Sequence, residues 1–175
     1  DEAVSLIWYL ENVFYKSFGS IYDYIQQNVF GDEPIENDIL NIGFWPGGDR
    51  DGNPFVTPEI TLKVASRLKE TVIKNYYRDV RSLKRKLSFD GLEERVDALE
   101  KKLYASVLNH NAIDAIGLDT FVSELNAIKE IIIKEHQSLY VSEITSLINK
   151  VHLFGFHFAI LDIRKDSRVH NDVFT

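Results

Sequence analysis

The chain contains neither cysteine nor methionine among its 175 residues. Without cysteine it can form no disulfide, no thiolate nucleophile and no cysteine-based zinc site. No apolar run approaches the roughly 18 residues that a membrane-spanning helix needs, and no signal peptide opens the chain. These absences favour a cytoplasmic protein that does not enter a membrane. The chain begins at Asp1 and not at methionine, which indicates a fragment of a longer polypeptide.

Acidic and basic residues are unevenly distributed along the chain, whose net charge is −7. Residues 1–40 carry eight acids and one base, whereas residues 57–88 carry nine bases and three acids. A basic helix can bind nucleic acid or phosphate, but it more often pairs with an acidic neighbour. Since the chain is acidic overall, we predict ion pairing within the protein and no nucleic-acid partner.

Apolar residues recur at helical spacing through most of the sequence, and 45% of the residues are hydrophobic. The fold is therefore predicted to be mainly α-helical, as a single unit over residues 1–175. Four sub-regions are expected. Residues 1–30 form aromatic-rich helices, and 39–56 form a strand followed by a Gly-rich loop. Residues 57–150 form long helices that include a helical hairpin, and 151–175 contain a further strand with the Leu-Asp-Ile-Arg segment. The expected helices are 3–29 (with a possible break at Gly19), 57–87, 92–109, 119–136 and 141–150, with a linker at 110–118. Apolar spacing places Tyr24 on the buried stripe of the first helix and predicts two further buried faces: the seam Leu92, Val96, Leu99, Leu103 and Val107, and the residues Phe121, Leu125, Ile128 and Ile132.

Two short segments read as buried β-strands. The apolar run 39–45 ends at a proline, and the run 154–163 is apolar on both alternating faces. Strand alternation places four side chains of the second run on one face: Phe158, Ile160, Asp162 and Arg164. A buried strand that ends in Asp and Arg presents both groups at its C-terminal edge, where barrels of parallel strands build their chemistry.

Residues 47–54 read Gly-Gly-Asp-Arg-Asp-Gly-Asn-Pro and form the most distinctive segment. Adjacent glycines allow close backbone approach, and Thr57 followed by Pro58 predicts a helix start. One interpretation is a solvated turn with an internal pair between Arg50 and its flanking carboxylates. A calcium loop fits poorly, because proline stands at the position of the invariant glycine and Ile60 at that of the bidentate glutamate.

Residues 47–54, with Val-Thr-Pro-Glu at 56–59, resemble a signature of phosphoenolpyruvate carboxylases. Residues 155–170 resemble a second block of that family, Leu-Asp-Ile-Arg-Gln-(Asp/Glu)-Ser with a trailing Arg-His, and depart from it at Lys165, where the family usually has glutamine. Both blocks occur in the family's order. The resemblance implies a fragment of a large helix-rich α/β-barrel.

The family resemblance also implies a chemistry. These enzymes join bicarbonate to phosphoenolpyruvate with Mg²⁺ or Mn²⁺, giving oxaloacetate for central metabolism, and the parent would be a cytoplasmic, allosteric homotetramer. Arg164 is expected to bind the substrate's phosphate, with Asp162 and His170 as supporting residues. Arg50, with the residues Asp49 and Asp51, would form a sugar-phosphate effector site or a structural loop.

The family's catalytic histidine motif, Thr-Ala-His-Pro-Thr, and its Gly-Arg-Gly-Gly loop are both missing from residues 1–175. The metal ligands are likewise expected outside this segment. We therefore expect the isolated chain to be inactive. The alternative is a helical module without chemistry that regulates or contacts subunits and binds a phosphorylated metabolite.

Overall fold

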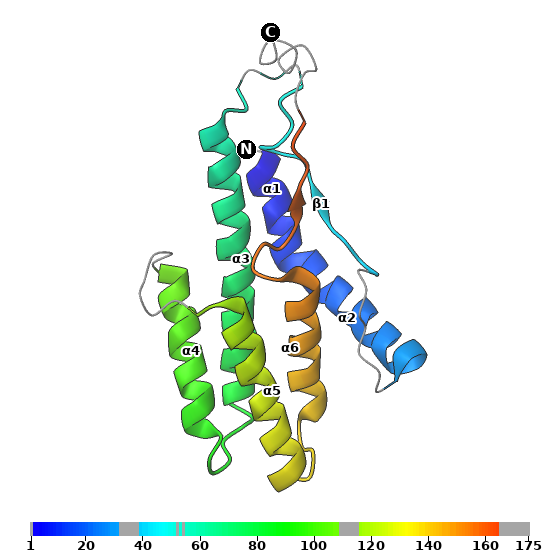
Figure 1. Cartoon of the computed structure of the whole chain (residues 1–175), viewed down its shortest axis with the longest axis vertical. Coiled ribbons are helices and arrows are strands. Elements are labelled where there is room, and N and C mark those ends of the chain that lie inside the picture. Colours follow the sequence, from blue (N-terminus) through cyan, green and yellow to red (C-terminus); the bar gives the residue numbers. More distant parts are fainter. Residues whose placement is uncertain (1, 32–38, 52, 54, 109–115, 165–175) are drawn as a thin grey trace.

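The computed structural model describes residues 2–31, 39–51, 53, 55–108 and 116–164. Within these ranges the chain is an elongated helical assembly with one two-stranded parallel sheet at one end (Figure 1). The elements are α1 (Glu2–Tyr9), η1 (Leu10–Phe14), α2 (Tyr15–Ile25), η2 (Gln26–Phe30), β1 (Gly43–Phe44), α3 (Pro58–Lys84), α4 (Glu93–Leu108), α5 (Leu118–Glu135), α6 (Val141–Phe154) and β2 (Ile160–Leu161), with η denoting a π-helix. The mainly helical prediction is confirmed.

The first helix runs without interruption from α1 to η2, contains two π-helical stretches, and bends between α1 and α2 (Figure 1). The possible break at Gly19 does not occur, because this buried glycine lies inside α2 against the side chain of Lys150. Wider π turns rotate the helix face, so the buried residues differ from the predicted stripe. Tyr15 and Tyr22 are buried, whereas Tyr24, predicted to be core, is 67% exposed.

The long helix α3 starts as predicted. The Thr57 hydroxyl accepts a hydrogen bond from the Ile60 backbone N–H, and Pro58 occupies the first turn. Its apolar face packs on α4 and α6, and the predicted helical hairpin of α3 and α4 is confirmed. The expected seam leading into and along α4 is buried except for Val107, which is only partly buried, and the apolar face of α5 is buried throughout: Leu92, Val96, Leu99, Leu103, Phe121, Leu125, Ile128 and Ile132. The predicted linker at 110–118 lies largely outside the described residues.

The basic side chains of α3 pair with acidic neighbours, as predicted. Lys74 and Arg78 both contact Glu11 of η1, and Lys84 contacts Asp97 and Glu100 of α4. Hydrogen bonds from Lys101 and Lys84 lower the pKa of Asp97 to about 2. These pairs join the first and fourth helices to α3 without contributing much stability singly, because they are solvent-exposed.

The centre of the molecule combines an aromatic cluster with a hydrogen-bond network around Asp79. The Tyr15 hydroxyl and the Lys150 ammonium each donate to Oδ2 of Asp79 at 2.8 Å, and Lys150 also lies over the Tyr15 ring. Burial raises the pKa of the Tyr15 hydroxyl, so this phenol stays neutral and donates. Tyr15 also stacks on Phe154 at the end of α6, so α2, α3 and α6 are fixed together.

The end of α6 is fixed by Tyr76, whose buried hydroxyl donates to the Gly155 carbonyl at 2.7 Å. We expect Tyr76→Phe to destabilise the protein by about 1–2 kcal/mol, because it leaves that buried carbonyl unpaired. Urea unfolding followed by circular dichroism measures the change. Tyr104→Phe is the control, since Tyr104 is 49% exposed, and it should change the free energy of unfolding by less than about 0.5 kcal/mol. Equal effects of both variants would contradict this role of the Tyr76 hydroxyl.

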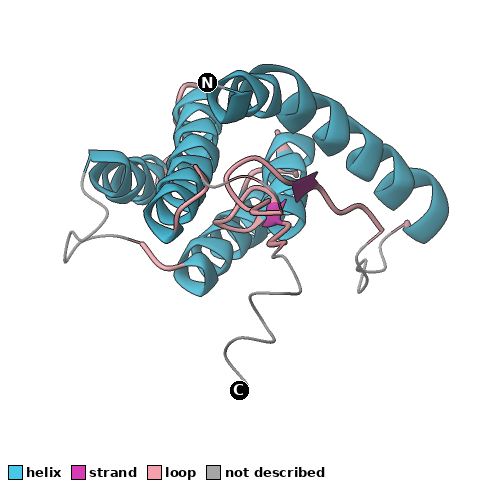
Figure 2. Cartoon of the chain, turned by 90° about the horizontal axis from the view of Figure 1, so that it is seen from above, coloured by secondary structure: helices cyan, strands magenta, loops and turns pink. Residues whose placement is uncertain are grey.

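The predicted strand at 154–163 is much shorter in the structure. Phe154 completes the buried face of α6, and Gly155 ends that helix with a φ of +52°. A turn then leads to β2, which pairs in parallel with β1 through Gly43 with Ile160 and Phe44 with Leu161. The prediction of burial on both faces is wrong for the described chain, because Ile160 is 50% exposed. Figure 2 shows the strand pair lying beside the helices and not between two complete layers.

Candidate functional site

The two distinctive sequence segments meet in space. Beyond the β1–β2 pair, Asp49 and Arg164 form a parallel bridge. The Arg50 backbone N–H donates to the Arg164 carbonyl at 3.0 Å, and the Arg164 N–H donates to the Gly48 carbonyl at 3.1 Å. The loop that follows β1 therefore runs beside the chain that follows β2, and both lie at the C-terminal edge of the short sheet.

This contact requires both glycines of the loop. A Cβ on Gly48 would lie 2.3 Å from the carbonyl oxygen of Asp162, closer than any non-bonded carbon can approach. Gly47 has a φ of +83°, and a Cβ there would lie 2.6 Å from the side chain of Val64 on α3. Gly47 thus lets the loop lie on α3, and Gly48 lets it lie on the strand.

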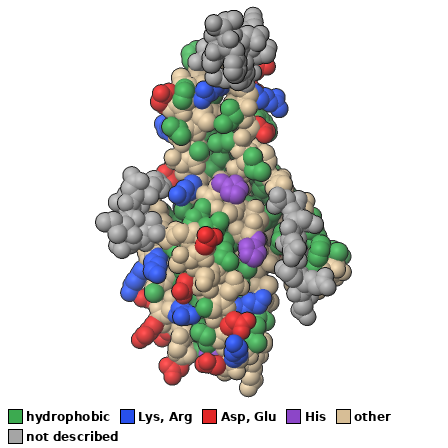
Figure 3. Space-filling view, viewed as in Figure 1, with side chains coloured by type: hydrophobic (Ala, Val, Ile, Leu, Met, Phe, Trp, Pro, Cys, Tyr) green, Lys and Arg blue, Asp and Glu red, His purple; other side chains and the backbone are tan. Residues whose placement is uncertain are grey.

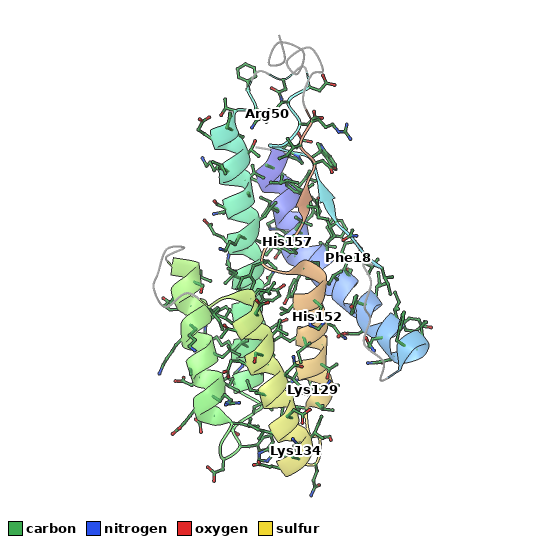
Figure 4. All side chains as sticks on the ribbon, viewed as in Figure 1. Phe18, Arg50, Lys129, Lys134, His152 and His157 are labelled. Atoms are coloured by element: carbon green, nitrogen blue, oxygen red, sulfur yellow. The ribbon has the colours of Figure 1, made fainter. Side chains whose placement is uncertain are left out.

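Arg50 points from the loop toward the start of α3 (Figure 4). Its Nη2 donates to Oγ1 of Thr61 at 3.1 Å, and that hydroxyl donates to the Gly47 carbonyl at 2.6 Å. Its Nε is buried without a hydrogen-bond partner among the described residues. The adjacent carboxylates do not pair with it in the described structure, and Asp49 instead accepts a bond from the Asp51 backbone N–H.

Arg164 and Asp162 are both exposed at the end of β2. No ion pair within 4 Å joins Arg164 to Asp162 or Asp49 in the described part of the chain, so its guanidinium is available to an external anion. Asp162 donates its backbone N–H to the Phe44 carbonyl at 3.0 Å, which places it in the ladder. His170 lies outside the described residues.

A cavity of about 430 Å³ adjoins the loop between β1, α1 and α3. Its charged lining is acidic, with Glu2, Asp49 and Asp51, and neither arginine lines it. This lining repels phosphate, so an anion would have to reach Arg164 from outside this cavity.

The described residues contain no group of three or more His, Asp or Glu side chains that could hold a metal ion. In the same ranges, no helix is long and apolar enough to cross a membrane.

Sequence reasoning singled out both arginines but missed Thr61, which holds Arg50 against the Gly47 carbonyl. One signal was present: Thr61 follows the helix cap Thr57 by four residues, so both hydroxyls lie on the face of α3 that meets the loop. The pairing of β1 with β2 was also not predicted, because it joins segments more than a hundred residues apart.

The geometry defines a mainly helical segment with a short two-stranded parallel sheet and an exposed arginine at the C-terminal edge of that sheet. Comparison with known proteins identifies the family. The model of the family "Phosphoenolpyruvate carboxylase" matches residues 1–116 and 111–175. This chain belongs to the phosphoenolpyruvate carboxylase family.

Individual relatives agree with this assignment. The phosphoenolpyruvate carboxylase of Shewanella loihica is 31% identical over 169 residues, covering 79% of this chain and 19% of the relative. That of Nitrosomonas eutropha is 27% identical over 217 residues, covering 99% of this chain and 23% of the relative. That of Parasynechococcus marenigrum is 24% identical over 237 residues, covering 98% and 23%. The chain spans about a fifth of the length of the curated relatives it matches.

Proposed function

We propose that this chain is part of an enzyme that carboxylates phosphoenolpyruvate with bicarbonate, giving oxaloacetate and phosphate. The observation that carries the proposal is the junction of residues 48–50 with Arg164, where the two segments that resemble the family signature hydrogen-bond to each other. Family membership supports the same reaction, since the matched relatives are named phosphoenolpyruvate carboxylases.

In this proposal, Arg164 binds the phosphate of the substrate. A guanidinium offers two parallel N–H donors to phosphate oxygens and stays charged at every physiological pH. Its backbone is fixed by hydrogen bonds on both sides, to Gly48 and from Arg50, while its side chain is exposed. Such an arrangement positions a phosphate and stabilises the negative charge that develops when its ester bond breaks.

The rest of the active site would come from a longer polypeptide. Two-stranded parallel sheets are not stable alone, and their faces and edges are normally covered. Here Trp45, Ile160 and Ile163 are 49–66% exposed around the sheet, and Val4 and Trp8 are exposed on α1. Figure 3 shows apolar side chains exposed near the strand end of the molecule, with charged side chains around them. We propose that further strands of a barrel cover these residues, and that residues 1–175 alone are inactive.

Several properties of the parent enzyme stay proposals: Mg²⁺ or Mn²⁺ bound by residues outside this segment, assembly as a homotetramer, allosteric control and a cytoplasmic location. A sugar-phosphate effector at Arg50 is also a proposal, supported by its partly buried guanidinium and its unpaired Nε. The second candidate function is a non-catalytic regulatory module. The loop at 47–54 would then bind a phosphorylated metabolite at Arg50 in a protein that does not carry out the carboxylation.

Bicarbonate-dependent formation of oxaloacetate tests the proposal, with NADH oxidation as the coupled readout. The full-length gene product should form oxaloacetate from phosphoenolpyruvate with Mg²⁺ present, and the purified 175-residue chain should form none. An inactive full-length product would favour the regulatory module. Turnover by the 175-residue chain would show that the site is complete without the missing motifs.

A further inference from the structure

A groove of about 590 Å³ lies away from both arginines, between the end of the first helix and the pair α5 and α6. Figure 1 shows α2 diverging from α6 at this point. The volume falls in the range of small-molecule sites, roughly 300–1,000 Å³. The family assignment and the proposed reaction give it no role.

The floor of the groove is apolar and its rim carries amide groups. Tyr22 and Ile148 are buried at its base, and Val141 and Ile133 form its walls. The rim contains Gln27, Asn126 and Asn149, besides others. The Asn149 Nδ2 donates to Asp23, so its carbonyl oxygen faces a fixed direction. Such a groove suits a ligand with an apolar body and one polar end.

The charge of the groove is opposite to that of the protein as a whole. The chain carries 27 acids against 20 bases, yet none of the described residues that line this cavity is Asp or Glu. Its ionisable members are Lys129 of α5 and His152 of α6, which Figure 4 places on neighbouring helices. Partial burial lowers the pKa of His152, so the imidazole is largely neutral at pH 7 and the lysine supplies the charge.

Lys129 is half-buried and makes no ion pair with another described residue, unlike Lys134, five residues further along α5, which pairs with Glu130 at 3.0 Å. Partial desolvation of an ammonium group is unfavourable when no carboxylate pairs with it, and no described carboxylate pairs with Lys129, so an anionic ligand would stabilise this group. We propose that this groove binds a small amphipathic carboxylate, with its apolar chain on Tyr22 and Ile148 and its carboxylate at Lys129. The inference does not rest on the proposed catalytic function.

Octanoate is the probe that tests the site, and octan-1-ol is its uncharged counterpart. In ¹H–¹⁵N correlation spectra of the 175-residue chain, octanoate should give saturable shifts at the side-chain amides of Asn126 and Asn149. The indole signals of Trp8 and Trp45 report adsorption on the exposed apolar surfaces, and they should stay unchanged at the same concentrations. Octan-1-ol should bind the same groove more weakly.

Three variants separate charge from shape. Lys129→Gln should weaken octanoate binding about tenfold and leave octan-1-ol binding unchanged, since it removes only the charge-assisted contact. Lys134→Gln, on the same helix but paired outside the groove, should change neither. Thr145→Phe fills the groove from α6 and should abolish both. Unfolding curves verify that each variant is folded.

The proposal is overturned by any of three results: no saturable shift at the groove amides, equal octanoate affinity in the wild type and Lys129→Gln, or indole shifts at the same concentrations as the amide shifts. The last would mean adsorption to exposed apolar surface only. None of these outcomes bears on oxaloacetate formation, so failure here and failure of the proposed reaction are distinguishable.

Discussion

Replacing Arg164 with alanine in the full-length enzyme is expected to lower kcat/KM for phosphoenolpyruvate by about 10²–10³-fold. The guanidinium is exposed and makes no ion pair with Asp162 or Asp49 in the described structure, so its removal should take away the proposed phosphate contact and break no ion pair between described residues. The free energy of unfolding should therefore change by less than about 0.5 kcal/mol. Steady-state oxaloacetate formation and urea unfolding measure the two quantities.

Arg164→Lys is the informative companion, because it keeps the charge and loses the paired donors. It should recover part of the activity but stay well below wild type. Arg78→Ala is the matched control, since this arginine is also exposed but contacts Glu11 and Asn75 at the helix interface. It should leave kcat/KM unchanged. Full activity in Arg164→Ala would assign this arginine a structural role and leave the phosphate to other residues.

Gly48→Ala is expected to destabilise the 175-residue chain by about 3 kcal/mol. Its new methyl group would lie 2.3 Å from the backbone oxygen of Asp162, and backbone cannot rotate away as a flexible side chain can. The loop and the strand must separate, which breaks the hydrogen bonds between Arg164 and residues 48 and 50. In the full-length enzyme, the same variant should also lower activity, because Arg164 would no longer be held in position.

Gly43→Ala provides a close control for this prediction. A Cβ there would also face Asp162, but at 3.4 Å from its side-chain oxygen, which is ordinary contact. Its effect on the free energy of unfolding should stay within about 0.5 kcal/mol. Urea unfolding of both variants decides the matter: equal stabilities would mean that the loop shifts without loss, and that the adjacent glycines do not hold the junction.

Helices were predictable because their signal is local. The Thr57 cap, the seam from Leu92 to Leu103 and the apolar face of α5 follow from spacing within one segment, and all three are as expected. The strand predicted at 154–163 was too long, because periodicity cannot distinguish the buried end of a helix from a buried strand. Phe154 belongs to α6, and only Gly155, two positions into the run, marked the change.

The candidate site was found only in part for a related reason. Arg164 and the loop at 47–51 were singled out from their residue types, but no local pattern pairs them across more than a hundred residues. Thr61 became part of the site through its bonds to Arg50 and Gly47. The possible pairing of Arg50 with its neighbouring carboxylates was a local hypothesis, and the described structure turns this side chain to α3 instead.

By itself, the sequence determined the helical class, the starts of the long helices, the pairing of a basic helix with acidic neighbours, and the two segments that identify the family. These depend on contacts a few residues apart or on charge balance. Tertiary structure alone decided that Gly48 lies against Asp162, that the guanidinium of Arg164 pairs with no described carboxylate, and that Lys129 lies at an apolar groove. Each depends on which surfaces meet after the chain folds, where close packing leaves room for some atoms and excludes others.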